Sequence, residues 1–485
     1  MTFIKSLQEK YRSDKIFLAE WILAIATGAF IFLTSCTWDL QSLTQWSVNV
    51  WHVLFNGHPR DLYAYTAQNV WHVHHAHMGS ELLSVLPWSI WNFPLFLIER
   101  FNGTAIVDSP WMLAYSKLFL VLLSVVMLIF TKKITMLITG DKTKSIWAMF
   151  LSASSLYLYL SVCYSGQNEI FMILASVIAV YCLLKKRQGW FIFWSALAIA
   201  IKPFFLLPFL AVLVLFEKNI LKIIGKAALS LVGLVGQKLL FMGAPGYSES
   251  MNSGPAKEML EEMFPKNIPT SFGQISLFAI CLVLIYIYSY SRDFSWDSLR
   301  TDHNRVAKYA IYVINLTYMS YLMFSPFSFY RVDILVPFLY IMMVQNEKMV
   351  FYTSILDVAM QFALMMQLIL RSSIMFNLGF VNRSVFQRLL GYYVEYDDQS
   401  KYMRTDLFLA EKFPTLVFFR PMFSAVAVIC GILLLVFNHP DEKYTLKVNA
   451  EKRCRVLLWI RILTIVPFAV ITLYLFTHAQ ERVYL

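Results

Sequence analysis

The sequence predicts an all-α protein that crosses a membrane about thirteen times, within a range of about 11 to 14 helices. Hydrophobic residues make up 58% of the 485 residues and charged residues only 15%, whereas soluble domains carry about 25% charged residues. The apolar residues fall in runs of about twenty, the helix length that crosses a hydrocarbon core roughly 30 Å thick. Because backbone amides in lipid must be hydrogen-bonded internally, these runs are predicted to be α-helices.

The charge distribution predicts how the chain is oriented. The net charge of +11 would suit a nucleic-acid-binding protein, but more than half of the Lys and Arg residues lie on alternate connections between the apolar runs. The positive-inside rule describes this bias. We therefore expect a multi-pass cell-membrane protein with a cytoplasmic N-terminus and no nucleic-acid partner. The connections assigned to the inside are 1–15, 132–144, 185–187, 217–226, 292–308, Lys348 and 438–455.

The apolar runs give the expected order of elements. The first span covers about 16–35 and is followed by a long outer segment, 36–111. Within that segment, Pro87 and Pro94 interrupt an apolar stretch at 82–98, which we interpret as interfacial or re-entrant helices, because another crossing would invert every later charged connection. The remaining expected spans are 112–131, 145–163, 169–184, 189–201, 204–216, 220–242, 273–290, 308–326, 333–347, 349–370, 415–437 and 456–477.

The two short spans at 189–201 and 204–216 flank Lys202-Pro203. Proline disfavours helix for the residue before it, and basic segments lie at the far end of both spans. We therefore expect Lys202 near the outer apex of a helical hairpin. Larger outer loops are expected at 243–271 and 372–413.

The cysteine and histidine patterns define no disulfide or metal site. The six Cys residues are scattered singly, without a CxxC pair. Most of the His residues lie in the outer segment, and His72-Val73-His74-His75-Ala76-His77 resembles a metal-binding tract. No acidic or Cys residues with metal-site spacing accompany it. We interpret the tract as an interfacial polar stretch and assign no metal or other cofactor, while a divalent metal ion stays an open alternative.

Asp39 follows the first expected span directly, in Cys36-Thr37-Trp38-Asp39-Leu40. A carboxylate at this outer boundary can act as general base on a hydroxyl group while a lipid-borne reaction partner lies in the bilayer beside it. The alternative is an ordinary hydrated interfacial Asp.

A turn rich in polar residues follows at Asn56–Tyr63, where Gly57 and Pro59 favour a change of direction. Arg60 and Asp61 offer a phosphate donor and a second candidate base. The alternative interpretation is a plain turn with a local ion pair.

Three later outer clusters are polar within apolar surroundings: Ser165–Glu169, Lys202-Pro203, and Ser325–Asp333. Ionisable groups at membrane depth are costly, so they tend to be functional or paired. Lys202 and Arg331 are cations suited to a phosphate, Arg as a planar fork and Lys as a point charge. The alternative for each is a snorkelling side chain at a helix end.

Further charges are expected inside the membrane at Asp357, Arg371 and Arg420. Their spacing suggests no catalytic role, and we expect them to pair with one another.

The order of these features resembles the GT-C superfamily of multi-span glycosyltransferases, and within it the polyprenol-phosphate-mannose-dependent α-mannosyltransferases. One departure is that Leu40 follows Asp39, where many members of the superfamily have paired acidic residues. The matching pieces are Asp39 after the first span, Gly57–Tyr63 in the long first outer loop, Gly166-Gln167-Asn168, Lys202-Pro203, Ser325-Pro326 through Tyr330, and Pro337.

The resemblance implies a GT-C-like catalytic transmembrane module at 1–350, including outer loop 36–111, and C-terminal helices at 351–485 with outer loop 372–413. It implies a hexosyltransferase that takes its sugar from a polyprenyl-phosphate lipid and passes it to a glycan or lipid acceptor on the extracytoplasmic face. Mannose is one candidate for the sugar. The implied roles are general base for Asp39, with Asp61 as the second candidate; donor-phosphate binding for Lys202, Arg331 and Arg60; and sugar or acceptor binding for Gln167, Asn168, Tyr330 and Tyr63.

Three other functions are alternatives for a polytopic chain. A lipid-linked-sugar flippase or transporter favours polar residues deep in several spans and an internal repeat, whereas these polar clusters gather at one face and no repeat is evident. A polysaccharide polymerase or ligase typically depends on Arg and His in a large late outer loop. The 372–413 loop has Arg383, Arg388 and Arg404 but no His. A structural scaffold would leave Lys202 and Arg331 unexplained.

Overall fold

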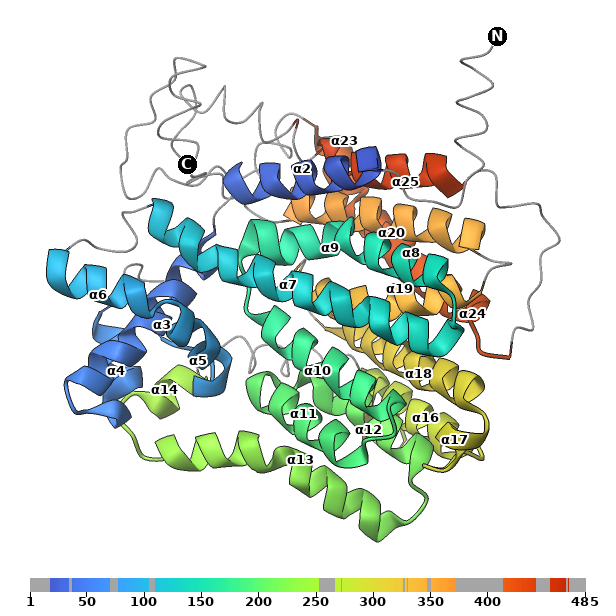
Figure 1. Ribbon diagram of the computed structural model, residues 1–485, viewed down its shortest axis with the longest axis horizontal. Coiled ribbons are helices and arrows are strands. Elements are labelled where there is room, and N and C mark those ends of the chain that lie inside the picture. The colour runs from blue at the N-terminus through green and yellow to red at the C-terminus, as the bar shows by residue number, and fades with distance from the viewer. Residues whose placement is uncertain are drawn as a thin grey trace.

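The computed structural model confirms the all-α class (Figure 1). Within the described residues the only strands are β1 (Asn267–Thr270) and β2 (Gly273–Ser276), which pair antiparallel. The span expected at 273–290 therefore begins as a strand and becomes helix only from Leu277. The described residues are 18–34, 37–69, 77–103, 110–252, 267–271, 273–325, 328, 330–346, 350–371, 413–441, 454–467 and 470.

Several helices have the length and composition of membrane spans. Within the described residues, four single helices qualify, and two bent helix pairs make six if each pair is counted as one span. The chain thus has the expected helical membrane character, whereas the expected number of about thirteen spans is not confirmed, and which end faces the cytoplasm remains a prediction. The four single helices that qualify are α7 (Pro110–Thr139), α13 (Ile220–Phe241), α20 (Val350–Arg371) and α24 (Arg420–Phe437).

The first bent pair lies in the outer segment. α5 (Leu82–Trp91) and α6 (Phe93–Asn102) meet at 69°. Pro87 lies inside α5 and Pro94 in the first turn of α6. The proline ring fixes its own backbone and removes an amide donor, so it favours a break in a helix. A bend of this size fits the re-entrant or interfacial pair expected at 82–98.

The second bent pair replaces the continuous span expected at 145–163. α8 (Lys142–Ala153) ends at Ser154-Ser155, and the chain continues at an angle of 43° as α9 (Leu156–Leu158) and the π-helix η4 (Tyr159–Ser165). The Ser154 hydroxyl donates to the Phe150 carbonyl at 2.8 Å. Serine hydroxyls compete for backbone groups in this way, so a serine pair is a known place for a helix to kink.

The centre of the bundle is formed by α10 (Glu169–Leu184), α18 (His303–Phe324) and α19 (Val336–Gln345), whose side chains are mostly buried. The hairpin expected around Lys202 is present as α11 (Gln188–Ile201) and α12 (Leu206–Phe216). α13 lies along one edge of the bundle (Figure 1). The remaining elements used below are α2 (Leu18–Thr34), α3 (Trp38–Phe55), η1 (Pro59–Asp61), α4 (Leu62–Gln68), α14 (Tyr247–Asn252), η5 (Pro203–Phe205), α16 (Leu277–Tyr290), η6 (Arg331–Leu335) and α25 (Cys454–Leu463).

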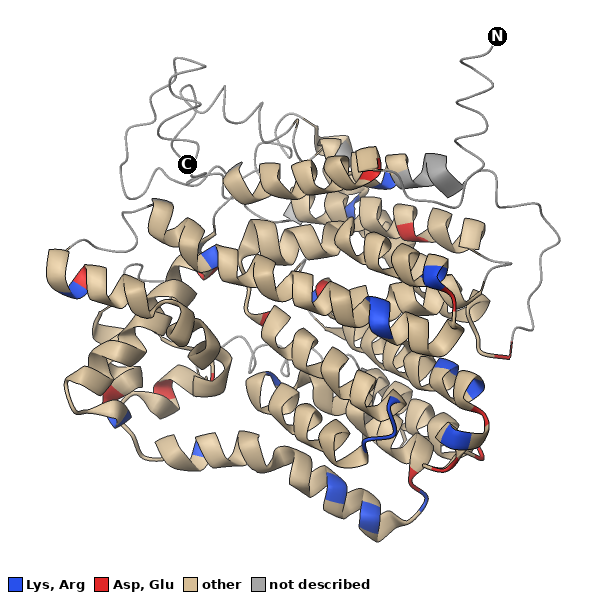
Figure 2. Ribbon diagram, in the orientation of Figure 1, with Lys and Arg blue, Asp and Glu red and all other residues tan. Residues whose placement is uncertain are grey.

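Basic residues concentrate at one end of the bundle. Figure 2 shows Lys and Arg where α7 ends, where α10 joins α11, where α12 joins α13 and where α16 leads into α18. These are four of the connections that the sequence assigns to the inside. The structure therefore brings them to a common end, which is the grouping that the positive-inside rule requires.

Gly166 closes the π-helix in a left-handed conformation, with φ at +66°. A Cβ added there would lie 2.8 Å from Leu40 Cδ1, so the turn packs tightly against the start of α3. Gly103 has nearly the same φ, +65°, but nothing lies within 4 Å of its added Cβ.

We expect Gly103→Ala to destabilise the protein by about 1–2 kcal/mol, because only the left-handed backbone is penalised. Gly166→Ala should lose about 1–3 kcal/mol more, because the new methyl group also displaces Leu40. Thermal unfolding of both variants in the same detergent measures the difference. Equal melting temperatures would contradict the tight packing of Gly166 on Leu40.

Candidate functional site

The polar clusters of the sequence meet at the end of the bundle opposite the basic connections. α10 begins at Glu169 and runs to the basic turn at 185–187, and α11 leaves that turn and returns to Lys202. α18 likewise begins in the basic segment 292–308 and ends just before Ser325. The start of α10, the end of α11 and the segment after α18 therefore lie at the same end of the bundle.

A buried ion pair joins the first two of these segments. Lys202 Nζ lies 2.5 Å from Glu169 Oε1, and the side chains are 17% and 1% exposed. Glu169 is in the first turn of α10, where the positive end of the helix dipole favours a carboxylate. Lys202 is extended ahead of Pro203, so α11 ends there and the ammonium group turns back toward α10.

Asp39 contacts the turn that precedes α10. The Gln167 side-chain amide donates to Asp39 Oδ2 at 2.5 Å, and the Thr37 hydroxyl donates to the Ser165 carbonyl at 2.7 Å. Together with the packing of Gly166 on Leu40, these bonds fix the first turn of α3 against residues 165–167. The expected base and one expected sugar-binding residue are therefore direct neighbours.

The segment after α18 completes the cluster. Arg331 is 8% exposed, and its guanidinium carbon lies 5.9 Å from the Phe204 ring centre and 5.7 Å from that of Tyr330. Burial raises the pKa of the Tyr330 phenol to about 12, and the nearby Arg331 opposes that rise. The phenol is thus a neutral hydrogen-bond donor at physiological pH. The charges of Asp39 and Glu169 also act on Tyr330, which places it near both carboxylates.

Asp333 is fully buried behind this cluster. Its Oδ2 accepts a hydrogen bond of 2.5 Å from the Ser161 hydroxyl on the π-helix. This bond links η6, which carries Arg331, to the segment that leads into Gln167. Within the described residues, Asp333 Oδ1 and Glu169 Oε2 have no hydrogen-bond partner.

Asn168 has a structural partner in the outer segment. Its side-chain amide donates to the Ser84 carbonyl at 3.1 Å, near the start of α5. Gln237 of α13 supports the same place, because it accepts from the Leu83 amide at 3.0 Å and donates to the Ala200 carbonyl at 2.6 Å. α5 is thereby held over the ends of α10 and α11.

Arg60, Asp61 and Tyr63 lie elsewhere in the outer segment. Arg60 donates to the Met242 carbonyl at 3.0 Å, and Asp61 ends η1 and is partly exposed. The fully buried Tyr63 ring packs 5.1 Å from Phe241, and its hydroxyl donates to the Ser80 carbonyl. These contacts belong to a small core between α4, α5 and the end of α13. Their phosphate, base and sugar roles remain predictions.

Glu169 and Asp333 are the residues of this cluster that sequence reasoning left without a role. Both stand inside motifs that the sequence analysis singled out, one at the end of Ser165–Glu169 and the other at the end of Ser325–Asp333. The sequence does hold a signal for Glu169, because this acidic residue begins an otherwise apolar helix. A charge in such surroundings needs a partner.

No group of three or more His, Cys, Asp and Glu side chains is placed to hold a metal ion within the described residues. His72, His74 and His75 of the expected tract lie outside those residues, as do most of the 372–413 loop and its three Arg residues. No family model, no curated protein and no solved structure matches the chain. The function is therefore inferred from the residues of the site alone.

We expect Glu169→Gln and Lys202→Met each to destabilise the protein by about 3–5 kcal/mol, because each leaves the other charge buried and unpaired. The double variant should lose much less than the sum of the two, since both charges are then gone. A double-mutant cycle of unfolding free energies in detergent measures this coupling. Additive losses would show that the pair is not coupled.

Proposed function

We propose that this chain is a membrane glycosyltransferase that transfers a sugar from a polyprenyl-phosphate lipid to an acceptor hydroxyl on the extracytoplasmic face. One observation carries the proposal: four segments far apart in sequence converge on one polar cluster in an otherwise apolar bundle. The segments bring a carboxylate at Asp39, an amide at Gln167, an ammonium at Lys202 and a guanidinium at Arg331.

The acceptor side of the reaction falls to Asp39. The acceptor oxygen attacks the anomeric carbon, the bond from that carbon to the phosphate oxygen breaks, and the acceptor proton passes to the Asp39 carboxylate. Gln167 donates a hydrogen bond to Asp39 Oδ2 and so fixes the direction of the carboxylate. Tyr330, a neutral phenol near Asp39, is suited to bind a hydroxyl group of the sugar or the acceptor.

The leaving phosphate falls to the two cations. Negative charge grows on the phosphate as the bond breaks, and fixed cations in a water-poor site stabilise that charge. An ammonium group has three N–H donors, so the contact of Lys202 with Glu169 leaves donors for a phosphate oxygen. Arg331 adds a planar fork that matches two phosphate oxygens.

The location of the cluster supports a lipid-borne donor. It lies at the ends of α10 and α11, opposite the basic connections. If those connections face the cytoplasm, the cluster faces outward at the level where the phosphate of a lipid carrier lies. An aqueous sugar nucleotide from the cytoplasm would have to cross the bundle to reach it.

The first test is transfer of a radiolabelled sugar from polyprenyl phosphate, with a panel of donor sugars, in membranes that contain the wild type, Asp39→Asn or Asp61→Asn. Asp39→Asn should lower the transfer rate by about 10²–10⁴-fold, the usual contribution of a general base. Asp61→Asn is the matched control and should retain most of the activity. Full activity of Asp39→Asn with loss in Asp61→Asn would move the base to Asp61, and no transfer by the wild type with any donor would favour the flippase alternative.

Arg331→Lys tests the phosphate role separately. Lysine keeps the positive charge but loses the planar fork, so we expect a rise of roughly tenfold in the KM for the donor, which corresponds to about 1.4 kcal/mol. The KM for the acceptor should stay nearly constant. Steady-state kinetics with each substrate varied in turn gives both values. An unchanged donor KM would remove Arg331 from donor binding.

A further inference from the structure

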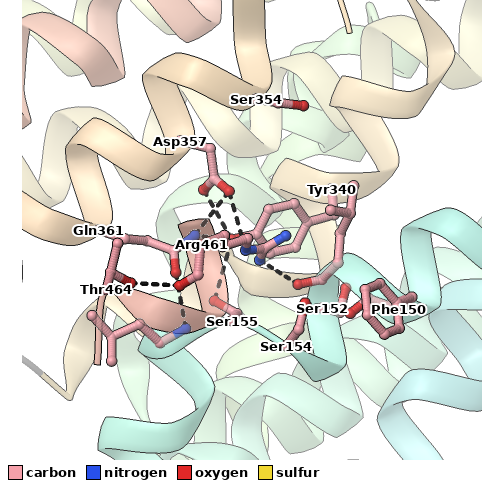
Figure 3. A network of polar contacts seen from close by, with 12 residues as sticks. Phe150, Ser152, Ser154, Ser155, Tyr340, Ser354, Asp357, Gln361, Arg461 and Thr464 are labelled. Carbon is pink, nitrogen blue, oxygen red and sulfur yellow. Dashed lines mark hydrogen bonds and ion pairs between the residues drawn. The ribbon is translucent and has the colours of Figure 1, made fainter. Parts of the chain in front are cut away.

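A second buried polar network lies deeper in the bundle, where α8 breaks (Figure 3). Arg461 of α25 and Asp357 of α20 are 2% and 1% exposed, and Arg461 Nε lies 3.4 Å from Asp357 Oδ2. The Arg461 guanidinium carbon also lies 4.4 Å from the centre of the Tyr340 ring. The sequence analysis expected Asp357 to pair with Arg371 or Arg420, and the structure pairs it with Arg461 instead.

Tyr340 connects this ion pair to the helix break. Its hydroxyl donates to Asp357 Oδ1 at 3.0 Å and lies 3.2 Å from the Ser155 hydroxyl. Gln361 joins from α20, with its amide 2.8 Å from Asp357 Oδ2. Three helices from the second half of the sequence, α19, α20 and α25, therefore meet around the break at Ser154-Ser155.

The network also satisfies the backbone groups that the break leaves without helical partners. Arg461 donates to the Leu151 carbonyl, and the Leu156 amide donates to Gln361 Oε1 at 3.1 Å. An unpaired peptide group in a lipid-surrounded bundle costs several kcal/mol. The break at Ser154-Ser155 is thus held by side chains from α20 and α25.

The same two segments that meet here also meet at the site. Ser155 faces Tyr340 in the network, and Ser161 bonds Asp333 beside the site. From the first contact to the second, the residue number rises from 155 to 161 on one segment and falls from 340 to 333 on the other. The two segments therefore run antiparallel and are joined at two points. Just beyond the Ser161–Asp333 bond, the Gln167 backbone amide donates to the Ser161 carbonyl at 3.1 Å. On the other segment, Arg331 lies in η6 just before Asp333.

We propose that the Arg461–Asp357–Tyr340 network positions the candidate site: it fixes the π-helix against α19, and so sets Gln167 relative to Arg331. Arg461, Asp357 and Tyr340 are then positioning residues, and α25, which carries Arg461, is needed to build the site. The effect on the local structure stands independently, whereas the effect on sugar transfer rests on the proposed function.

A purely stabilising role makes a different prediction. Apolar residues of similar volume often replace a buried ion pair without loss of stability, but they cannot reproduce its directional bonds to Leu151, Tyr340 and Gln361. The double variant Asp357→Leu/Arg461→Met therefore separates the two roles. Tyr340→Phe is a milder variant that removes only the hydroxyl. Tyr157→Phe is the matched control, because the buried Tyr157 hydroxyl nearby has no hydrogen-bond partner within the described residues.

Hydrogen–deuterium exchange of the purified full-length protein in detergent, read by mass spectrometry, measures the local effect without any activity. We expect Tyr340→Phe and the double variant to speed exchange at 155–169 by tenfold or more, with 188–201 in α11 unchanged. Tyr340→Phe should nearly keep the melting temperature, whereas the double variant should lower it, because the Leu151 carbonyl then loses its donor. Tyr157→Phe should match the wild type. Unchanged exchange at 155–169 in both variants, or equally faster exchange in both segments, would overturn the proposal.

The transfer assay separates this proposal from the proposed function. If the wild type transfers sugar, Tyr340→Phe should lower kcat by tenfold or more while Tyr157→Phe keeps it. Faster exchange at 155–169 with full kcat would overturn the positioning of the site. Faster exchange in a protein that transfers no sugar with any donor would support the local positioning and count against the proposed function.

Discussion

The contact between Glu169 and Lys202 is the constraint on which the site depends. A carboxylate buried in an apolar bundle requires a cation. Lys202 can pair with Glu169 only if α10 and α11 form a hairpin in which the start of α10 lies beside the end of α11. That arrangement puts Gln167 just before Glu169, where it reaches Asp39, and puts Phe204 just after Lys202, where its ring lies close to Arg331. The ion pair thus sets the frame in which the other polar groups meet.

The elements most predictable from the sequence are the helices that coincide with a single apolar run. α10 matches the run expected at 169–184 and α11 the one at 189–201, because polar residues bound both runs sharply. The break at Ser154 was not predictable, since two serines fit within an apolar window without lowering its hydropathy much. The π-helix leaves no trace in composition, because its extra residue per turn is a property of hydrogen bonding.

For the site, topology predicts the common end and packing decides the contacts. Lys202, Gln167 and Tyr330 were expected on one side because the basic connections alternate along the chain. The bond from Gln167 to Asp39 depends on Gly166 lying against Leu40, which no linear pattern encodes. Arg461 stands next to a basic stretch that indicates an inner flank, so its pairing with Asp357 appears only in three dimensions.

Because the site is assembled from distant segments, its residues are synthesised and inserted at different times. Asp39 leaves the ribosome roughly 290 residues before Arg331, which at about 5–20 residues per second is about 15–60 s. Glu169 and Lys202 enter the membrane as neighbours in one hairpin, so their charges can neutralise each other early. Arg461 follows Asp357 by about 100 residues, and until it is inserted Asp357 and the broken backbone at Ser154 lack it. The nascent chain therefore carries these unmatched polar groups until α25 is inserted.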